Sequence, residues 1–220
     1  MNKNKIKLLS EQYRISEMAG INQMVGKNLI STDIQPEYES FFNFKIWDFI
    51  EFLNNNFNDL NSLTFLYNGQ ETLGMIAEND YKNWLYENGL KESIIEQSTL
   101  YDKGYGSFRS CLDFSVEEGI EEEQIVNLIK FMMKNNIHDV SDFSKSNWKS
   151  WLKENDYKNI KEFLENSGEA FYIPDLVEEL KTIPQPIILC GGGIKECLKE
   201  VELALMAIDK NYSLLTKFVY

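Results

Sequence analysis

The chain has 220 residues, of which 43% are hydrophobic, enough for the core of one α/β domain with an additional segment. A formal net charge of -13 argues against a surface for nucleic acid or an anionic membrane, because both are negatively charged. No apolar run reaches the length of a membrane span, no signal-type core follows Met1, and the cysteine count is odd, so we expect a protein of the reducing cytoplasm.

The first half of the chain alternates apolar runs with amphipathic segments. In chain order we expect a partly helical segment around 6–18, a strand over 27–33, a helix over 46–53, a strand over 63–67, a helix over about 80–88 and a strand over 94–101. The first of these strands ends on Asp33, and the last leads into a glycine-rich turn that contains Lys103. Strands that alternate with helices predict a parallel sheet.

Residues 106–167 break this rhythm. Apolar periodicity over 125–133, the tryptophans at 148 and 151, and the segment 156–164 predict three helices without a strand between them. We therefore divide the chain into an α/β domain (1–105 and 168–220) and a helical insertion (106–167). Because the insertion starts directly after Lys103, we expect it to act as a lid or an interaction surface over the carboxyl edge of the sheet.

The segment 186–205 predicts a strand, a glycine turn and a helix, after a short helix over 176–181 and before a last strand over 212–220. The run Gly191–Gly193 permits a sharp turn, and the helix begins near Cys197. Free N–H groups and the positive end of the helix dipole favour a thiolate there, so Cys197 is a candidate nucleophile. We expect Cys111 and Cys190 to be structural.

Three residues that could carry chemistry follow predicted strands, namely Asp33, Lys103 and Cys197. The carboxyl ends of parallel strands share one edge of a sheet, so these residues can converge as a base, a cation and a nucleophile. Plainer interpretations stay open for each of them. Asp33 would also serve as a strand-end cap, Lys103 as an exposed lysine with Lys161 as a rival, and Cys197 as a small buried residue.

The segment Gly191-Gly-Gly-Ile-Lys-Glu-Cys197-Leu-Lys-Glu-Val-Glu-Leu-Ala-Leu resembles the cysteine segment of the isochorismatase-like cysteine hydrolases. Thr32-Asp33-Ile34-Gln35 is similar to the first-strand motif of that family, and Glu169-Ala170-Phe171 with the helix after it is similar to the segment before the cysteine strand. The resemblance implies a three-layer α/β/α fold with a mostly parallel six-stranded sheet in the order 3-2-1-4-5-6 and the first strand near its centre.

The resemblance also implies a mechanism. Asp33 would accept the thiol proton, Lys103 would stabilise and orient, and Cys197 would attack a carbonyl to form a thioester. The N–H groups of Gly193 and Cys197 would form an oxyanion hole, with a cis peptide before Gly193, and Gln35, Gly192 and Phe171 would contact the substrate. That substrate would be a small-molecule amide or carbamoyl compound, cleaved at its C–N bond without a cofactor. No metal is expected, because residues 68–80 lack the histidines of the nicotinamidase site.

Two departures support alternatives from other functional classes. Ile194 and Lys195 stand where the family usually has small or hydroxyl residues, which favours a catalytically silent homologue that binds a protein or a ligand. The glycine run would also suit a nucleotide-binding module, although Glu196 stands where a phosphate loop would need a third glycine. A homo-oligomer is left open, and neither nucleic acid nor a membrane is an expected partner.

Overall fold

The structure is a computed structural model that describes residues 14–18, 24–69, 76–103, 121–137, 142, 148–154 and 174–220. The chain divides into two compact units. We call the first the sheet unit, which contains residues 14–105, 182–201 and 211–220. We call the second the helical unit, which contains residues 1–13, 106–181 and 202–210.

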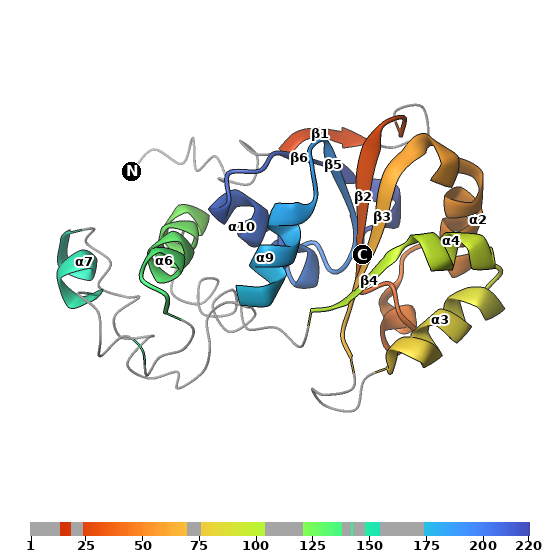
Figure 1. Ribbon diagram of the computed structural model, residues 1–220, viewed down its shortest axis with the longest axis horizontal. Helices are drawn as coiled ribbons and strands as arrows, with labels where there is room; N and C mark the ends of the chain where they lie inside the picture. Colours follow the sequence, from red (N-terminus) through yellow and green to blue (C-terminus); the bar gives the residue numbers. More distant parts are fainter. Residues whose placement is uncertain are drawn as a thin grey trace. The chain divides into compact units, whose positions relative to one another are not determined.

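A parallel β-sheet forms the centre of the sheet unit (Figure 1). Its strands are β1 (Arg14–Met18), β2 (Lys27–Thr32), β3 (Leu60–Tyr67), β4 (Thr99–Asp102), β5 (Ile187–Gly191) and β6 (Tyr212–Leu215). They lie in the order β1-β6-β5-β2-β3-β4, and every neighbouring pair is parallel. The central β2 and β5 are buried almost along their whole length, as expected of apolar strands covered on both faces.

The α/β class and the parallel sheet are thus confirmed. The strands β2 to β6 follow the predicted order 3-2-1-4-5, but the sixth strand was predicted wrongly. Residues after β6 form the 3-10 helix η4 (Thr216–Phe218), and the edge beside β6 is occupied by β1 from the N-terminal part of the chain. The helix expected around 6–18 is therefore a strand at 14–18, because pairing with β6 overrides a weak local preference.

The region 94–101 also differs from the prediction of a single strand. It contains the helix α4 (Glu92–Gln97) followed by the short strand β4. Ile94 and Ile95 are both buried, which adjacent residues achieve on the inner side of a helix but not on one face of a strand. One helical turn therefore explains the apolar pair better than an alternating strand does.

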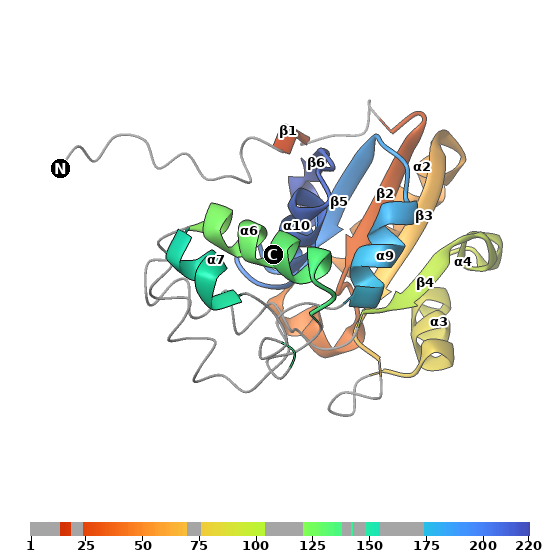
Figure 2. The ribbon, with the colours of Figure 1, turned by 60° about the vertical axis from the view of Figure 1, so that its left-hand side comes forward.

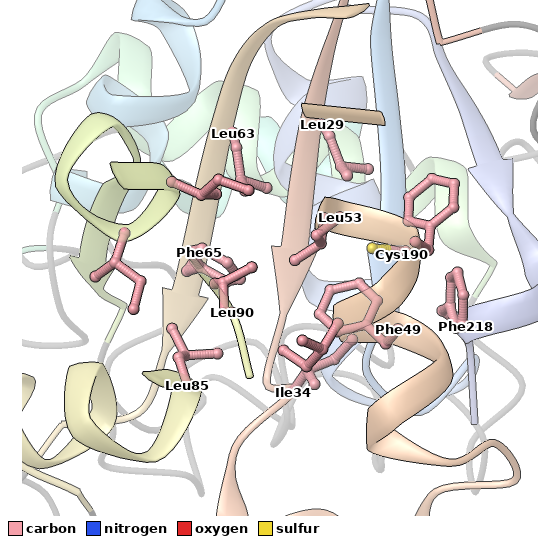
Figure 3. Close-up of a cluster of buried hydrophobic side chains, with 14 of the residues drawn as sticks. Leu29, Ile34, Phe49, Leu53, Leu63, Phe65, Leu85, Leu90, Cys190 and Phe218 are labelled. Carbon is pink, nitrogen blue, oxygen red and sulfur yellow. The ribbon is translucent and has the colours of Figure 1, made fainter. Parts of the chain in front are cut away.

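Helices α2 (Ile46–Asn56), α3 (Glu78–Glu87) and α4 pack against one face of the sheet (Figures 1 and 2). Leu63 and Phe65 point to this face because side chains two apart on a strand share it. Figure 3 shows them in the buried cluster that also contains Leu29, Cys190 and Phe49 of α2. Burying each Leu or Phe side chain contributes about 1.5–3 kcal/mol, so this core holds the strands that carry the site.

The helical unit contains α6 (Glu122–Lys134), α7 (Trp148–Glu154) and most of α9 (Pro174–Thr182). A capping box between Glu121 and Gln124 starts α6, and Phe131 stacks on Trp151 with ring centroids 4.7 Å apart. Two of the three predicted insertion helices are confirmed by α6 and α7, and none of the described residues between 121 and 154 forms a strand. The third, at 156–164, lies outside the described residues, and the placement of the insertion over the sheet edge stays a prediction.

Helix α10 (Cys197–Ala207) follows β5 and contributes its first residues to the sheet unit. Every residue from Leu198 to Ala207 is buried. Among the described parts of the chain, we find no helix with the length and apolar character that a membrane span requires.

Candidate active site

Asp33 and Lys103 meet at the carboxyl edge of the sheet. Asp33 directly follows β2 and Lys103 directly follows β4, and the Lys103 Nζ lies 3.1 Å from the Asp33 Oδ2. Both side chains are almost completely buried, at 1% and 0% exposure. Neither Asp33 oxygen accepts a well-aligned hydrogen bond from the described residues, so this contact is mainly an attraction between charges.

The backbone of Asp33 adopts a left-handed conformation, with φ 51°, at this edge of the sheet. Aspartate tolerates that conformation better than most residues. The Asp33 N–H donates to the carbonyl of Leu66 on β3, and its carbonyl accepts a hydrogen bond of 3.0 Å from the hydroxyl of Tyr220. Burial and the charge of Asp33 raise the pKa of Tyr220, which keeps that hydroxyl protonated.

The ammonium of Lys103 has three polar neighbours. Besides Asp33, the Asn68 Oδ1 lies 3.1 Å from its Nζ and the Glu200 Oε2 lies 3.5 Å away. Burial lowers the pKa of Lys103, but the charges of Asp33 and Glu200 raise it by more, so its pKa is above the ordinary value. Lys103 is therefore a buried cation at neutral pH, shared between two carboxylates.

Cys197 stands at the first position of α10 and is partly buried next to this charged group. Burial raises the pKa of its thiol most, the Asp33 carboxylate raises it further, and Lys103 lowers it. The pKa of the thiol therefore lies well above its ordinary value, whereas the helix start alone favours a thiolate. Burial, together with the charges of Asp33 and Glu200, outweighs the effect of the Lys103 ammonium, so the thiol needs a base before it can attack.

The turn between β5 and α10 requires its first two glycines. Gly191 and Gly192 have φ of 75° and 66°, and a Cβ on Gly191 would lie 2.1 Å from the carbonyl oxygen of Thr32. A Cβ on Gly192 would lie 2.7 Å from the backbone nitrogen of Leu198. The peptide before Gly193 is not cis, contrary to expectation, because two left-handed glycines already turn the chain.

The two N–H groups proposed as oxyanion donors differ from other N–H groups of this turn, which donate to backbone carbonyls. The N–H of Ile194 donates to the Tyr220 carbonyl at 2.9 Å, and that of Leu198 donates to the Gly193 carbonyl at 3.2 Å. The N–H groups of Gly193 and Cys197 have no such acceptor within the described residues. These two donors are therefore available to an oxygen of a bound molecule.

Gln35 and Asn68 support the cation. The Asn68 N–H donates to the Gln35 Oε1 at 2.8 Å, and the Gln35 Nε2 donates to the Glu37 Oε2 at 2.9 Å. The fully buried Gln35 amide thus holds Asn68, whose side chain faces Lys103 and also donates to the Tyr38 hydroxyl. Burial, followed by the charge of Asp33, raises the pKa of Tyr38 to about 12.

The remaining substrate contacts stay predictions. Gly192 is buried and its carbonyl accepts a hydrogen bond of 3.2 Å from the backbone of Tyr220. Phe171 and Cys111 lie outside the described residues. Cys190 is fully buried in the core of the sheet unit, where burial raises its pKa to about 12, which suits a structural role.

Sequence analysis missed three residues of this site, namely Asn68, Glu200 and Tyr220. Asn68 directly follows the predicted strand 63–67, where an asparagine before Gly69 also fits an ordinary turn. Glu200 follows Cys197 by three residues and so shares its helix face, a spacing that would have placed it near the thiol. Tyr220 is the last residue of the sequence and carries no local signal of its contacts.

The arrangement combines a thiol, a buried carboxylate, a buried ammonium and two backbone N–H donors at one edge of the sheet. Together these groups can deprotonate the thiol and stabilise an oxyanion that forms beside it. Within the described part of the chain, no group of three or more His, Cys, Asp or Glu side chains is placed to hold a metal ion. Comparison with known proteins finds no family model, no curated protein and no solved structure that matches this chain.

Proposed function

We propose that the protein is a cysteine-dependent hydrolase that cleaves the C–N bond of a small-molecule amide or carbamoyl compound through a thioester. The observation that supports this proposal best is the partly buried Cys197 thiol beside the buried Asp33–Lys103 pair. The resemblance of the segments around Asp33 and Cys197 to the isochorismatase-like cysteine hydrolases points the same way, and the three-layer arrangement is part of the same proposal.

In the first half of the reaction, the Cys197 thiol transfers its proton to Asp33 while its sulfur forms a bond with the substrate carbonyl carbon. The carbonyl π electrons move onto the oxygen, which accepts hydrogen bonds from the N–H groups of Gly193 and Cys197. Collapse of this intermediate breaks the C–N bond, and the proton held by Asp33 passes to the leaving nitrogen. An amine or ammonia and a thioester on Cys197 result.

In the second half, Asp33 accepts a proton from a water molecule that attacks the thioester carbon. The C–S bond then breaks, and the proton on Asp33 returns to the Cys197 sulfur. An acid is released and the thiol is restored. In enzymes that stabilise an oxyanion in this way, each donor is worth about 3–4 kcal/mol of barrier, so the glycine turn would contribute substantially to catalysis.

One observation favours the catalytically silent alternative. The thiol has a raised pKa and faces two carboxylates, and the turn that borders it carries the exposed Ile194 and Lys195. A protein that had lost turnover would keep the buried charges for stability while the exposed turn diverged. Such a protein would bind a ligand or a partner at this edge without cleaving it.

A panel of small primary amides, ureides and carbamates separates the two proposals. We expect release of ammonia or amine from at least one compound and a mass increase on the Cys197 peptide after acid quench. Cys197→Ala should abolish both signals, whereas Cys190→Ala, the matched removal of a core thiol, should keep them in the folded protein. Compounds that raise the melting temperature of the wild type without product or adduct would instead support the silent alternative.

A further inference from the structure

We propose that Glu200 is a positioning residue of this site, whose carboxylate keeps the Lys103 ammonium paired while Asp33 carries the proton of the thiol. The inference rests on the proposed hydrolase function. It adds a second carboxylate to the reaction, one that never contacts the substrate and acts through Lys103.

The position of Glu200 supports this role. Its Oε2 lies 3.5 Å from the Lys103 Nζ, and the two side chains are only 4% and 1% exposed. Glu200 lies one turn after Cys197 on α10, so the helix that places the nucleophile also places this carboxylate. Glu196, which precedes Cys197 on the same segment, is exposed.

Counting the charges through the reaction shows when Glu200 matters. In the resting site, the negative Asp33 and Glu200 share the positive Lys103. When the proton has moved from the Cys197 sulfur to Asp33 and the sulfur has bonded to carbon, both of these groups are neutral. The negative charge then lies on the substrate oxygen at the backbone N–H groups, and Glu200 is the carboxylate that still pairs Lys103. Without it, the buried ammonium would keep no negative partner among the described residues at the moment of highest energy.

The other titratable groups around the thiol do not replace Glu200. Tyr38 and Tyr220 both interact with Cys197, but their raised pKa values keep them neutral near pH 7. Glu196 interacts with Tyr220 from the exposed start of the helix, where water screens its charge. Among the described residues, Asp33, Lys103 and Glu200 are therefore the charged groups that act on Cys197 most strongly.

The test compares Glu200→Gln with the matched control Glu196→Gln, which removes the same charge from an exposed position. The rate of Cys197 alkylation by iodoacetamide is measured against pH by peptide mass spectrometry, and amide hydrolysis is measured in parallel. Removing the Glu200 charge eases thiolate formation, so the alkylation profile should move down by about one pH unit. Hydrolysis should nevertheless fall by about 10- to 100-fold, because Lys103 loses its partner during proton transfer. Glu196→Gln should change neither the alkylation profile nor the rate of hydrolysis.

The outcomes separate the two proposals. A lowered alkylation profile together with slower hydrolysis supports the inference. A lowered profile in a protein whose wild type hydrolyses no amide supports the pairing of Glu200 with Lys103 and overturns the hydrolase. An unchanged profile, or unchanged hydrolysis despite a lowered profile, overturns the role of Glu200. If Glu200→Gln does not fold, as judged by circular dichroism, Glu200→Asp retracts the charge by one methylene. Glu200→Asp should then move the alkylation profile down by less than the shift of about one pH unit expected of Glu200→Gln. An unchanged profile in Glu200→Asp again overturns the inference.

Discussion

Replacing Lys103 by Met tests whether the buried charges at the sheet edge depend on one another. Methionine keeps much of the length and apolar stem of lysine, so the change removes mainly the ammonium. It leaves the carboxylates of Asp33 and Glu200, with side chains 0% and 4% exposed, without the cation 3.1 and 3.5 Å away. Leaving a buried charge unpaired costs about 3–5 kcal/mol, a large share of the roughly 5–15 kcal/mol of a typical domain.

Urea unfolding followed by circular dichroism measures this loss. The control is Lys82→Met, which breaks the exposed ion pair between Lys82 and Glu78 and should cost no more than about 0.5 kcal/mol. Adding Asp33→Asn to Lys103→Met removes the carboxylate 3.1 Å from the lost ammonium and should recover most of the lost stability. A Lys103→Met protein within about 1 kcal/mol of the wild type would refute the reasoning, because the carboxylates could then not be both buried and charged.

Two further predictions concern titration and the chain end. In the folded protein the pKa of Cys190 is raised from 9.0 to about 12, so its contribution to stability is complete below pH 9 and is lost as the pH rises to about 12. Urea unfolding across this window should show the free energy of unfolding falling by up to about 1.4 kcal/mol per pH unit for each such group. Cys190→Ala should make this fall with pH less steep. An equally steep fall in the variant would contradict the raised pKa of Cys190. Tyr220→Phe removes the hydrogen bond to the Asp33 carbonyl and should cost about 0.5–1.5 kcal/mol and reduce hydrolysis, whereas Tyr86→Phe, at an exposed position, should change neither. Equal behaviour of the two tyrosine variants would exclude a role for the Tyr220 hydroxyl.

The sheet and the meeting of Asp33 with Lys103 were predictable because they depend on short local patterns. Apolar runs bounded by turn residues marked β2, β3 and β5, and the carboxyl ends of parallel strands converge by geometry. The N-terminal strand was missed because its formation depends on pairing with β6, a partner at the other end of the chain. Local sequence carries no trace of such a partner.

The electrostatic surroundings of Cys197 could not be predicted for a related reason. The helix start alone favours a thiolate, but burial raises the pKa of the thiol most, and the carboxylates of Asp33 and Glu200 raise it further against the opposing effect of Lys103. Glu200 follows Lys199 in the sequence, and adjacent charged residues are typical of a solvated helix face, although in the structure both are buried. The partners of a buried charge come from distant segments of the chain, and the sequence alone does not show which segments meet in the fold.

The strand order has a consequence for how the chain is completed during synthesis. β2 meets β3 early, since Asn28 and its partner Ser62 are only 34 residues apart, whereas Asn28 and Pro184, just before β5, are separated by 156. Until β5 emerges from the ribosome, one edge of the apolar β2 stays open, and such an edge can pair with another nascent chain. The interior strands β5 and β6 are therefore the last to join the sheet, and a translational pause before β5 would prolong the stage at which the growing chain is most open to aggregation.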